Sequence, residues 1–258
     1  MRYKVTLSYD GSSFSGWQIQ NQEPTIQECL QKALKTLLKE EIAVTGAGRT
    51  DSKVHAINYV AHFDTSRTDL DTAAIGYKLN AILPPGIRVH EIVPADPEFH
   101  ARFDARLREY KYFIHRNKDP FMDAYSYLYT FPLDVEAMNS AAESLLGEHN
   151  FSCFEKVGSD NKTSVCKVFY AHWDYWEPDH LRILGYPAPR EDYLVFTVRA
   201  DRFLRNMVRA IVGTLLDIGR GKQPPSRTEE LLRGGTRSDA GESVPGHALF
   251  LSKITYQP

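Results

Sequence analysis

Residues 46–56 (GAGRTDSKVHA) hold the densest set of side chains that could do chemistry. Asp51 supplies a carboxylate, and Arg49 supplies a guanidinium that can bind a phosphate through two hydrogen bonds. Two glycines two residues apart allow the backbone to turn sharply and to approach a ligand closely. A carboxylate held on such a turn can act as a nucleophile or an acid–base group. The alternative is an ordinary turn, in which Thr50 and Asp51 satisfy local backbone amides.

The basic residues are concentrated in two segments. The formal net charge of -2 gives no general reason to expect a nucleic-acid ligand. Residues 102–118 and residues 199–222, however, each hold six Lys or Arg against two acidic residues. Such segments can attract a polyanion to one face while the protein stays soluble, although solvated helix and strand faces would give the same counts.

Four side chains within these segments are further candidates. Arg202, Arg205 and Arg209 recur at three- and four-residue spacing, which predicts a basic edge on a helix and makes Arg209 a candidate cationic partner of Asp51. Tyr110 lies on a predicted strand, where its ring could hold a base taken out of the stack, with Tyr112 on the same face. The alternatives are a solvated helix face for the arginines and a core position for the tyrosine.

The elements of the first part of the chain place Asp51 in a loop after a strand end. Alternating apolar residues indicate strands, helical apolar spacing indicates helices, and Thr25 with Glu28 forms a potential capping box. The predicted elements are a strand over 2–9, a helix over 26–38, a strand over 57–63, a helix over 71–83 and a strand over 87–93. Phe14 and Trp17, in the loop after the first strand, could touch RNA or anchor their own loop.

A second round of elements begins near residue 105, without a convincing internal repeat. The predicted elements are a strand over 110–114, a helix over 134–146, a strand over 193–199, a helix over 203–218 and a strand over 248–256. Gly219 follows the predicted helix over 203–218, at a position where a left-handed glycine often ends a helix. Residues 226–229 form a second potential capping box. We therefore predict an α+β protein of two similar halves, residues 1–105 and 106–258.

Composition excludes several classes of protein. Hydrophobic residues make up 42% and charged residues 25%, as in ordinary soluble proteins, and neither a signal peptide nor a membrane span is visible. Three widely spaced cysteines predict reduced thiols and a cytoplasmic location. The histidines and cysteines lack metal-ligand spacing, and glycine patterns that bind nucleotide phosphates are missing. We expect no metal and no cofactor.

The motif around Asp51 closely resembles the signature of the tRNA pseudouridine synthase A family. Further blocks stand in the family's order and approximate spacing, so that the resemblance covers essentially the whole chain. These blocks are residues 9–11 (YDG), 16–18 (GWQ), 27–28 (QE), 99–103 (FHARF), 110–112 (YKY) and 206–213 (NMVRAIVG). The resemblance implies a pseudouridine synthase fold, in which two α/β halves with mostly antiparallel sheets meet at a central basic cleft.

The resemblance also implies a reaction and a substrate. It implies a homodimeric isomerase that converts uridine to pseudouridine at positions 38, 39 and 40 of the tRNA anticodon stem-loop. Asp51 would then be the catalytic carboxylate, Arg209 its partner and Tyr110 the residue that stacks on the target base. Arg49 would grip RNA. Asp51 could attack C1′, add to C6 of the ring or remove the C2′ proton, and the sequence does not choose among these routes.

One position departs from the family pattern. A small residue and then a glycine usually follow the catalytic aspartate, whereas Ser52 and Lys53 stand here. If the glycine serves a positive φ, Lys53 is strained by roughly 1 kcal/mol or more. Alternatively the turn accepts a side chain, and Lys53 projects towards a phosphate. We favour this second interpretation and include Lys53, with Arg202 and Arg205, among the candidate RNA-binding residues.

Two other functions remain open from the residues alone. A non-catalytic tRNA-binding or folding module could use the same basic patches and would leave the uridine unchanged. A hydrolase of the glycosidase type would use paired carboxylates and release free base or sugar. Only one carboxylate stands out in a motif, which argues against the hydrolase.

Overall fold

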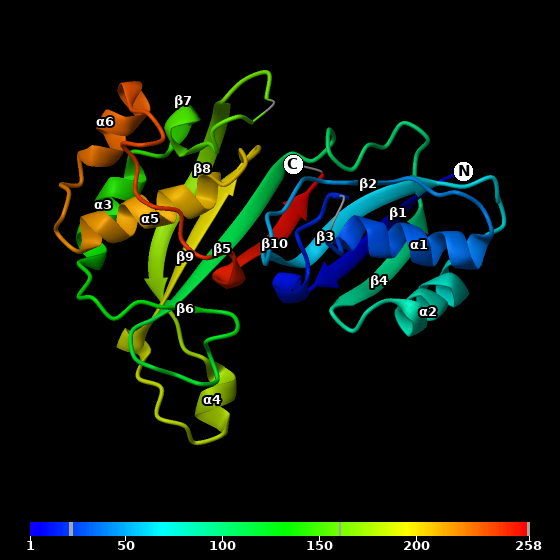
Figure 1. The fold of residues 1–258 in the computed structure, drawn as a ribbon, viewed down its shortest axis with the longest axis horizontal. Coiled ribbons are helices and arrows are strands. Elements are labelled where there is room, and N and C mark those ends of the chain that lie inside the picture. The colour runs from blue at the N-terminus through cyan, green and yellow to red at the C-terminus, as the bar shows by residue number, and fades with distance from the viewer. Residues whose placement is uncertain (21–22, 160, 257–258) are drawn as a thin grey trace. The chain divides into compact units, whose positions relative to one another are not determined.

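The computed structural model describes residues 1–20, 23–159 and 161–256, and these form two compact units (Figure 1). Unit 1 comprises Met1–Arg108 together with Phe250–Pro258, and unit 2 comprises Glu109–Leu249. The sequence-based division at residue 105 differs in one respect, because the C-terminal strand belongs to the first unit. Both units combine helices with mostly antiparallel strands, so the predicted α+β class is confirmed.

Unit 1 is a sheet with two helices. Its strand order is β4-β1-β3-β10, with β2 also paired to β3. All these pairings are antiparallel except that of β10 with β3, which is parallel. The strands are β1 (Arg2–Tyr9), β2 (Val44–Gly46), β3 (His55–Asp64), β4 (Ile87–Pro94) and β10 (Leu249–Thr255), and the helices are α1 (Ile26–Leu38) and α2 (Thr72–Ile82).

The patterns that predicted these elements hold for β1 and α1 but fail in part of β3 and β4. Alternate residues of β1 are buried, and the Thr25 hydroxyl accepts a hydrogen bond from the backbone N–H of Glu28 at 3.3 Å. In β3 the predicted alternation is wrong, because Ile57 is exposed and both Val60 and His62 are buried. In β4 the alternation predicted through Val93 is wrong. The register against β1 shifts between Thr6 and Leu7, so Ile92 is buried and Val93 is half-buried.

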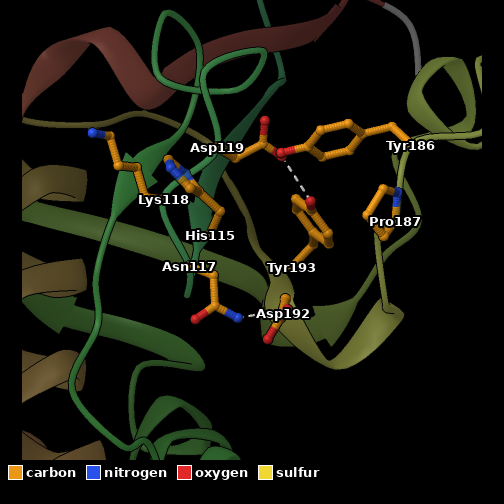
Figure 2. Close-up of a pocket in the computed structure, with 8 residues that line it drawn as sticks. All are labelled: His115, Asn117, Lys118, Asp119, Tyr186, Pro187, Asp192 and Tyr193. Atoms are coloured by element: carbon orange, nitrogen blue, oxygen red, sulfur yellow. Dashed lines mark hydrogen bonds between the residues drawn. The ribbon is translucent and has the colours of Figure 1, made fainter.

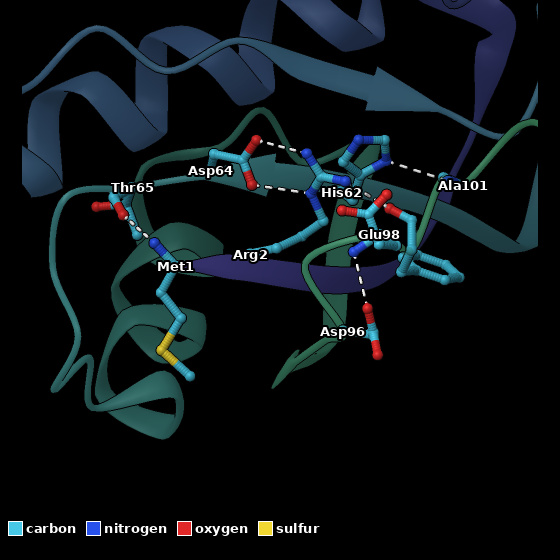
Figure 3. A network of polar contacts seen from close by, with 9 residues as sticks. Met1, Arg2, His62, Asp64, Thr65, Asp96, Glu98 and Ala101 are labelled. Atoms are coloured by element: carbon cyan, nitrogen blue, oxygen red, sulfur yellow. Dashed lines mark hydrogen bonds and ion pairs between the residues drawn. The ribbon is translucent and has the colours of Figure 1, made fainter.

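A network of polar contacts ties the beginning of β1 to the end of β3 and to the loop after β4 (Figure 3). Arg2 donates two hydrogen bonds to the Asp64 carboxylate, at 2.9 and 2.8 Å, and a third to the carbonyl of Phe99. The Ala101 N–H donates to Nδ1 of buried His62 at 3.1 Å. Burial, followed by the charges of Arg2 and His100, lowers the pKa of His62 to about 4. The ring is therefore neutral at pH 7, as an accepting Nδ1 requires.

Unit 2 combines further strands of the same sheet with four helices among its described residues. Its strand order is β5-β9-β8-β7, β6 pairs in parallel with β5, and β8 is antiparallel to both of its neighbours. The strands are β5 (Leu107–His115), β6 (Tyr127–Leu128), β7 (Gly147–Asn150), β8 (Val165–Tyr175) and β9 (Tyr193–Ala200). The helices are α3 (Val135–Glu143), α4 (Asp179–Ile183), α5 (Met207–Gly219) and α6 (Arg227–Gly234).

Helix α5 begins later than predicted, which corrects the expected basic helix edge. Asn206 has a left-handed backbone with φ of 67°, and the first helical residue is Met207. A left-handed residue cannot continue a right-handed helix, so Arg202 and Arg205 lie in the loop before α5. Only Arg209 of the three arginines is on the helix.

Two predicted helix signals are also wrong. Gly219 is still helical, and the left-handed glycine that follows α5 is Gly221, with φ of 71°. Gly219 instead allows close packing, because a Cβ there would lie 2.5 Å from Sδ of Met138. At α6 the Ser226 hydroxyl makes no cap and donates to the Glu230 carboxylate at 3.1 Å.

Two further observations concern membrane-spanning helices and the cysteines. None of the helices within residues 1–20, 23–159 and 161–256 is long and apolar enough to cross a membrane. The three cysteines are free thiols, as predicted, and Cys153 and Cys166 are buried.

Candidate active site

Asp51 lies in the loop that joins β2 to β3, as predicted. The Val54 N–H donates to the carbonyl of Asp51 at 3.2 Å, which closes a four-residue turn. Lys53 is the third residue of this turn and has φ of 65°. A positive φ at that place is typical of a type II turn, where glycine is preferred. The positive φ that would strain a lysine, the less favoured of the two alternatives, is therefore present, and the side chain of Lys53 is exposed.

The Asp51 loop is fixed on one side by the loop that follows β1. The Trp17 N–H donates to the Thr50 carbonyl, and the Lys53 N–H donates to the Phe14 carbonyl, both at 3.2 Å. The rings of Phe14 and Trp17 are 7% and 3% exposed. This burial supports the interpretation that both aromatics anchor their own loop.

Glycines make the contact between these two loops possible. A Cβ at Gly11 would lie 2.1 Å from the carbonyl oxygen of Val54. A Cβ at Gly16, which also has φ of 87°, would lie 2.3 Å from the carbonyl oxygen of Thr50. The two backbones are thus closer than any side chain would allow. This close approach holds the turn that carries Asp51.

The two glycines before Asp51 serve different purposes. A Cβ at Gly46 would meet the Tyr59 hydroxyl at 2.1 Å and the Trp17 ring at 2.5 Å, so Gly46 is needed for packing. A Cβ at Gly48 would meet no atom within 4 Å among the described residues. Gly48 is instead fixed through its backbone, because the Tyr59 hydroxyl bonds both its N–H and its carbonyl. Tyr59 was not singled out from the sequence.

His55 is a second residue that sequence reasoning missed. Its ring is 1% exposed and stacks on Phe250 with 4.5 Å between ring centroids. Its Nδ1 accepts the Gly11 N–H at 3.1 Å and lies 3.1 Å from the Asp10 carboxylate. His55 thus links the loop after β1 to the start of β3. The only signal was its place in the motif of residues 46–56.

Arg49 and Lys53 flank Asp51 with two exposed cations. Neither side chain forms a hydrogen bond or an ion pair with other residues of the described ranges 1–20, 23–159 and 161–256. Asp51 itself is half-buried. The loop therefore carries a carboxylate two residues away from each of two exposed cations, a set of groups suited to a phosphate-bearing substrate.

The other candidates belong to unit 2. Arg209 is the third residue of α5 and is half-buried, and its Nε donates to the Val244 carbonyl at 2.6 Å. Arg205 is exposed and Arg202 is half-buried. Other cations of the same segment have internal partners: Arg199 pairs with Glu109, and Arg220 lies over the Phe131 ring at 3.6 Å.

Tyr110 and Tyr112 have different surroundings on β5. Tyr110 is 9% exposed, and its ring meets that of Phe203 edge to face at 5.1 Å. Tyr112 is fully buried, and its hydroxyl donates to the Pro245 carbonyl at 3.0 Å. Tyr112 is thus a core residue with a polar contact.

A small polar pocket lies elsewhere in unit 2 (Figure 2). Its volume is about 50 Å³, far below the several hundred Å³ typical of ligand sites. Its polar groups bind one another: the Tyr193 hydroxyl donates to Asp119 at 2.7 Å, and Asn117 donates to Asp192 at 2.7 Å. None of the predicted site residues lines it. We assign it no ligand.

Metal binding has no geometric support in the described part of the chain. Within it, no group of three or more His, Cys, Asp or Glu side chains could hold a metal ion. The chemistry available to the described site residues is therefore that of a carboxylate, guanidinium groups, an ammonium and a tyrosine.

Comparison with known families gives a match over most of the chain. The family model described as tRNA pseudouridine synthase matches residues 6–104 and 141–257, which include the Asp51 loop and all of α5. The chain belongs to the tRNA pseudouridine synthase family. It is accordingly an isomerase that converts uridine to pseudouridine in tRNA.

Individual relatives define the subgroup. Proteins named tRNA pseudouridine synthase A from Bacteroides thetaiotaomicron and Bacteroides fragilis are 46% and 45% identical to this chain. Each alignment covers 99% of the chain, and 90% and 96% of the relative. The protein of that name from Bacillus subtilis is 38% identical, over 99% of both chains. The resemblance inferred from the motifs is thereby confirmed.

Proposed function

We propose that this enzyme isomerises uridines at positions 38, 39 and 40 of the tRNA anticodon stem-loop, with Asp51 as the catalytic carboxylate. The observation that carries the proposal is the Asp51 turn. It is held by backbone contacts from the loop after β1 and flanked in sequence by exposed Arg49 and Lys53. Rigid placement of a reacting group is a main source of rate enhancement.

The reaction rearranges bonds without redox change or net hydrolysis. The N1–C1′ bond breaks, the uracil turns, C5 bonds to C1′, and the proton on C5 is lost while N1 gains one. Asp51 assists by attacking C1′, by adding to C6 or by removing the C2′ proton. Each route requires an ionised carboxylate beside the target nucleotide.

The remaining candidates are assigned roles around this step. Arg209 pairs with Asp51 and orients it, because a guanidinium can grip a carboxylate through two hydrogen bonds. Tyr110 stacks on the target base. Arg49, Lys53, Arg202 and Arg205 bind backbone phosphates. The predicted basic cleft, the homodimer and the cytoplasmic location are proposals as well.

The test is to map the product by position. Unmodified tRNA carrying uridine at 38, 39 or 40 is incubated with the enzyme, labelled with carbodiimide and analysed by mass-resolved mapping. Pseudouridine at these positions, and not in other stems, supports the proposal. Pseudouridine only elsewhere in the tRNA would overturn the positional assignment. Unchanged uridine would indicate a binding module, and release of free uracil would indicate a hydrolase.

A further inference from the structure

Arg209 occupies an electrostatically unfavourable place that the protein compensates. It is the third residue of α5, where the helix dipole opposes a positive charge. Residues 241–245, here called the strap, supply the compensation. The Val244 carbonyl accepts Nε of Arg209 at 2.6 Å, and the Val244 N–H donates to the Arg209 carbonyl at 3.3 Å. Val244 thus binds both the side chain and the backbone of Arg209.

The strap lies directly on α5. A Cβ at Gly213 would lie 1.8 Å from the carbonyl oxygen of Glu242, and a Cβ at Gly241 would lie 2.6 Å from the backbone nitrogen of Thr214. The Gly241 N–H also donates to the Thr214 hydroxyl at 2.9 Å. Two glycines therefore allow backbone to touch backbone, which leaves the strap little freedom to shift along the helix.

Three further side chains hold the strap. The Ser243 hydroxyl accepts hydrogen bonds from Arg237 at 2.7 Å and from Asn206 at 2.6 Å. The Pro245 carbonyl accepts the hydroxyl of buried Tyr112 at 3.0 Å. Burial raises the pKa of Tyr112, so this hydroxyl stays protonated and can act only as the donor to that carbonyl. The carbonyl that receives Arg209 is therefore bracketed by anchored residues on both sides.

We propose that the strap, anchored by Tyr112 through Pro245 and by Arg237 through Ser243, positions the Arg209 guanidinium for the isomerisation. Tyr112 is then a positioning residue that acts from within the core, through Pro245 and Val244. This inference rests on the proposed role of Arg209 as the partner of Asp51. The strap acts through hydrogen bonds alone, and no group changes its charge.

Tyr112→Phe removes one hydroxyl and keeps the ring. It leaves the Pro245 carbonyl without its side-chain donor, which loosens that anchor of the strap. We expect kcat on tRNA to fall about tenfold while KM changes less than about twofold, because a displaced Arg209 affects the reacting state and not the grip on RNA. Ser243→Ala, which removes the other anchor point, should show the same split between kcat and KM.

Tyr256→Phe is a matched control. The Tyr256 hydroxyl also donates to a backbone carbonyl, that of Ala101 at 2.7 Å, and burial raises its pKa too. This variant loses a similar hydrogen bond in unit 1, away from the strap. Its melting temperature should fall by a similar amount to that of Tyr112→Phe, while kcat stays within about twofold of wild type.

A double-mutant cycle separates this inference from the proposed function. Arg209→Lys retains the charge but cannot reproduce the guanidinium geometry, so it should itself be slow. Adding Tyr112→Phe to it should then lower kcat less than twofold further. A further tenfold loss of kcat in the double variant, or a wild-type kcat in Tyr112→Phe, would contradict the positioning role of the strap. Neither result would contradict the proposed Asp51–Arg209 pair. A wild-type kcat in Arg209→Lys would overturn both.

Discussion

The hydroxyl of Thr50 lies 2.9 Å from the hydroxyl of Tyr9, and both side chains are buried. Tyr9 is the last residue of β1, and Thr50 directly precedes Asp51. The side chain before the proposed catalytic carboxylate is thus tied to the central part of the sheet of unit 1. Together with the backbone contact from Trp17 to Thr50, this bond prevents the loop from moving as a free turn. The backbone position of Asp51 is therefore set by the buried contacts of its neighbour Thr50.

Lys53 allows charge and strain to be measured separately. Lys53→Gly should raise the free energy of unfolding by about 0.5–1 kcal/mol, because glycine relieves the left-handed backbone and offsets its own entropic cost. If Lys53 contacts a phosphate, the log–log slope of tRNA affinity against salt should also fall by roughly 1.

Lys39 provides the control for Lys53. It is another exposed lysine with a left-handed backbone, φ of 62°, at the end of α1. Lys39→Gly should raise stability similarly and leave the salt slope unchanged. If the salt slope is also unchanged in Lys53→Gly, Lys53 does not contact a phosphate, and the effect of the lysine is backbone strain alone.

The two exposed arginines should contribute to affinity more than to rate. Arg49→Gln and Arg205→Gln are each expected to lower the salt slope of tRNA binding by roughly 1, with kcat little changed at saturating tRNA. Arg199→Gln is the comparison, since Arg199 already pairs with Glu109. It should alter stability and not the slope. If Arg49→Gln and Arg205→Gln had the same salt slope of tRNA binding as Arg199→Gln, the proposed phosphate contacts of Arg49 and Arg205 would be contradicted.

Tyr110 should act through its ring. Tyr110→Phe is expected to bind tRNA almost as wild type does, whereas Tyr110→Ala should lose about 1–3 kcal/mol of stacking with the base. Because Tyr110 also packs on Phe203, the alanine variant should be less stable, so binding is measured well below its melting temperature. Small, equal effects of both changes on binding would place Tyr110 in the core alone.

His62 should make the enzyme less stable in mild acid. Its pKa is about 4 in the fold and about 6.5 when unfolded, so the unfolded chain binds more protons between these values. Stability is then fully present above pH 6.5 and is lost as the pH falls towards 4, by up to roughly 3 kcal/mol. Unfolding of wild type and His62→Gln should be compared from pH 7 to 4.5. Their free energies should converge on acidification, and parallel curves would contradict this assignment.

Sequence reasoning succeeded where one local pattern decides the structure. The alternation of β1, the cap at Thr25 and the loop position of Asp51 each depend on a few neighbouring residues. The positive φ at Lys53 was one of two alternatives raised by the motif, and the other was favoured.

Sequence reasoning failed where contacts distant in the chain decide. Arg202 and Arg205 have helical spacing to Arg209, but Asn206, held by Ser243, interrupts the helix before Met207. Gly219 serves packing against Met138 and ends no helix. His55, Tyr59 and the strap could not be found from spacing, because their roles depend on contacts that join different segments. Tyr59 is 11 residues from Gly48, the strap residue Gly241 is 27 from Thr214, and His55 is 44 from Gly11.

The most direct test of the account is the activity of Asp51→Asn, purified free of host enzyme and assayed in single turnover on unmodified tRNA. The substitution keeps the size of the side chain and removes the carboxylate. The account predicts that pseudouridine formation falls a thousandfold or more, while tRNA affinity stays within about tenfold, because the loss falls chiefly on the transition state. Substantial pseudouridine formed by this variant would contradict the central role of Asp51.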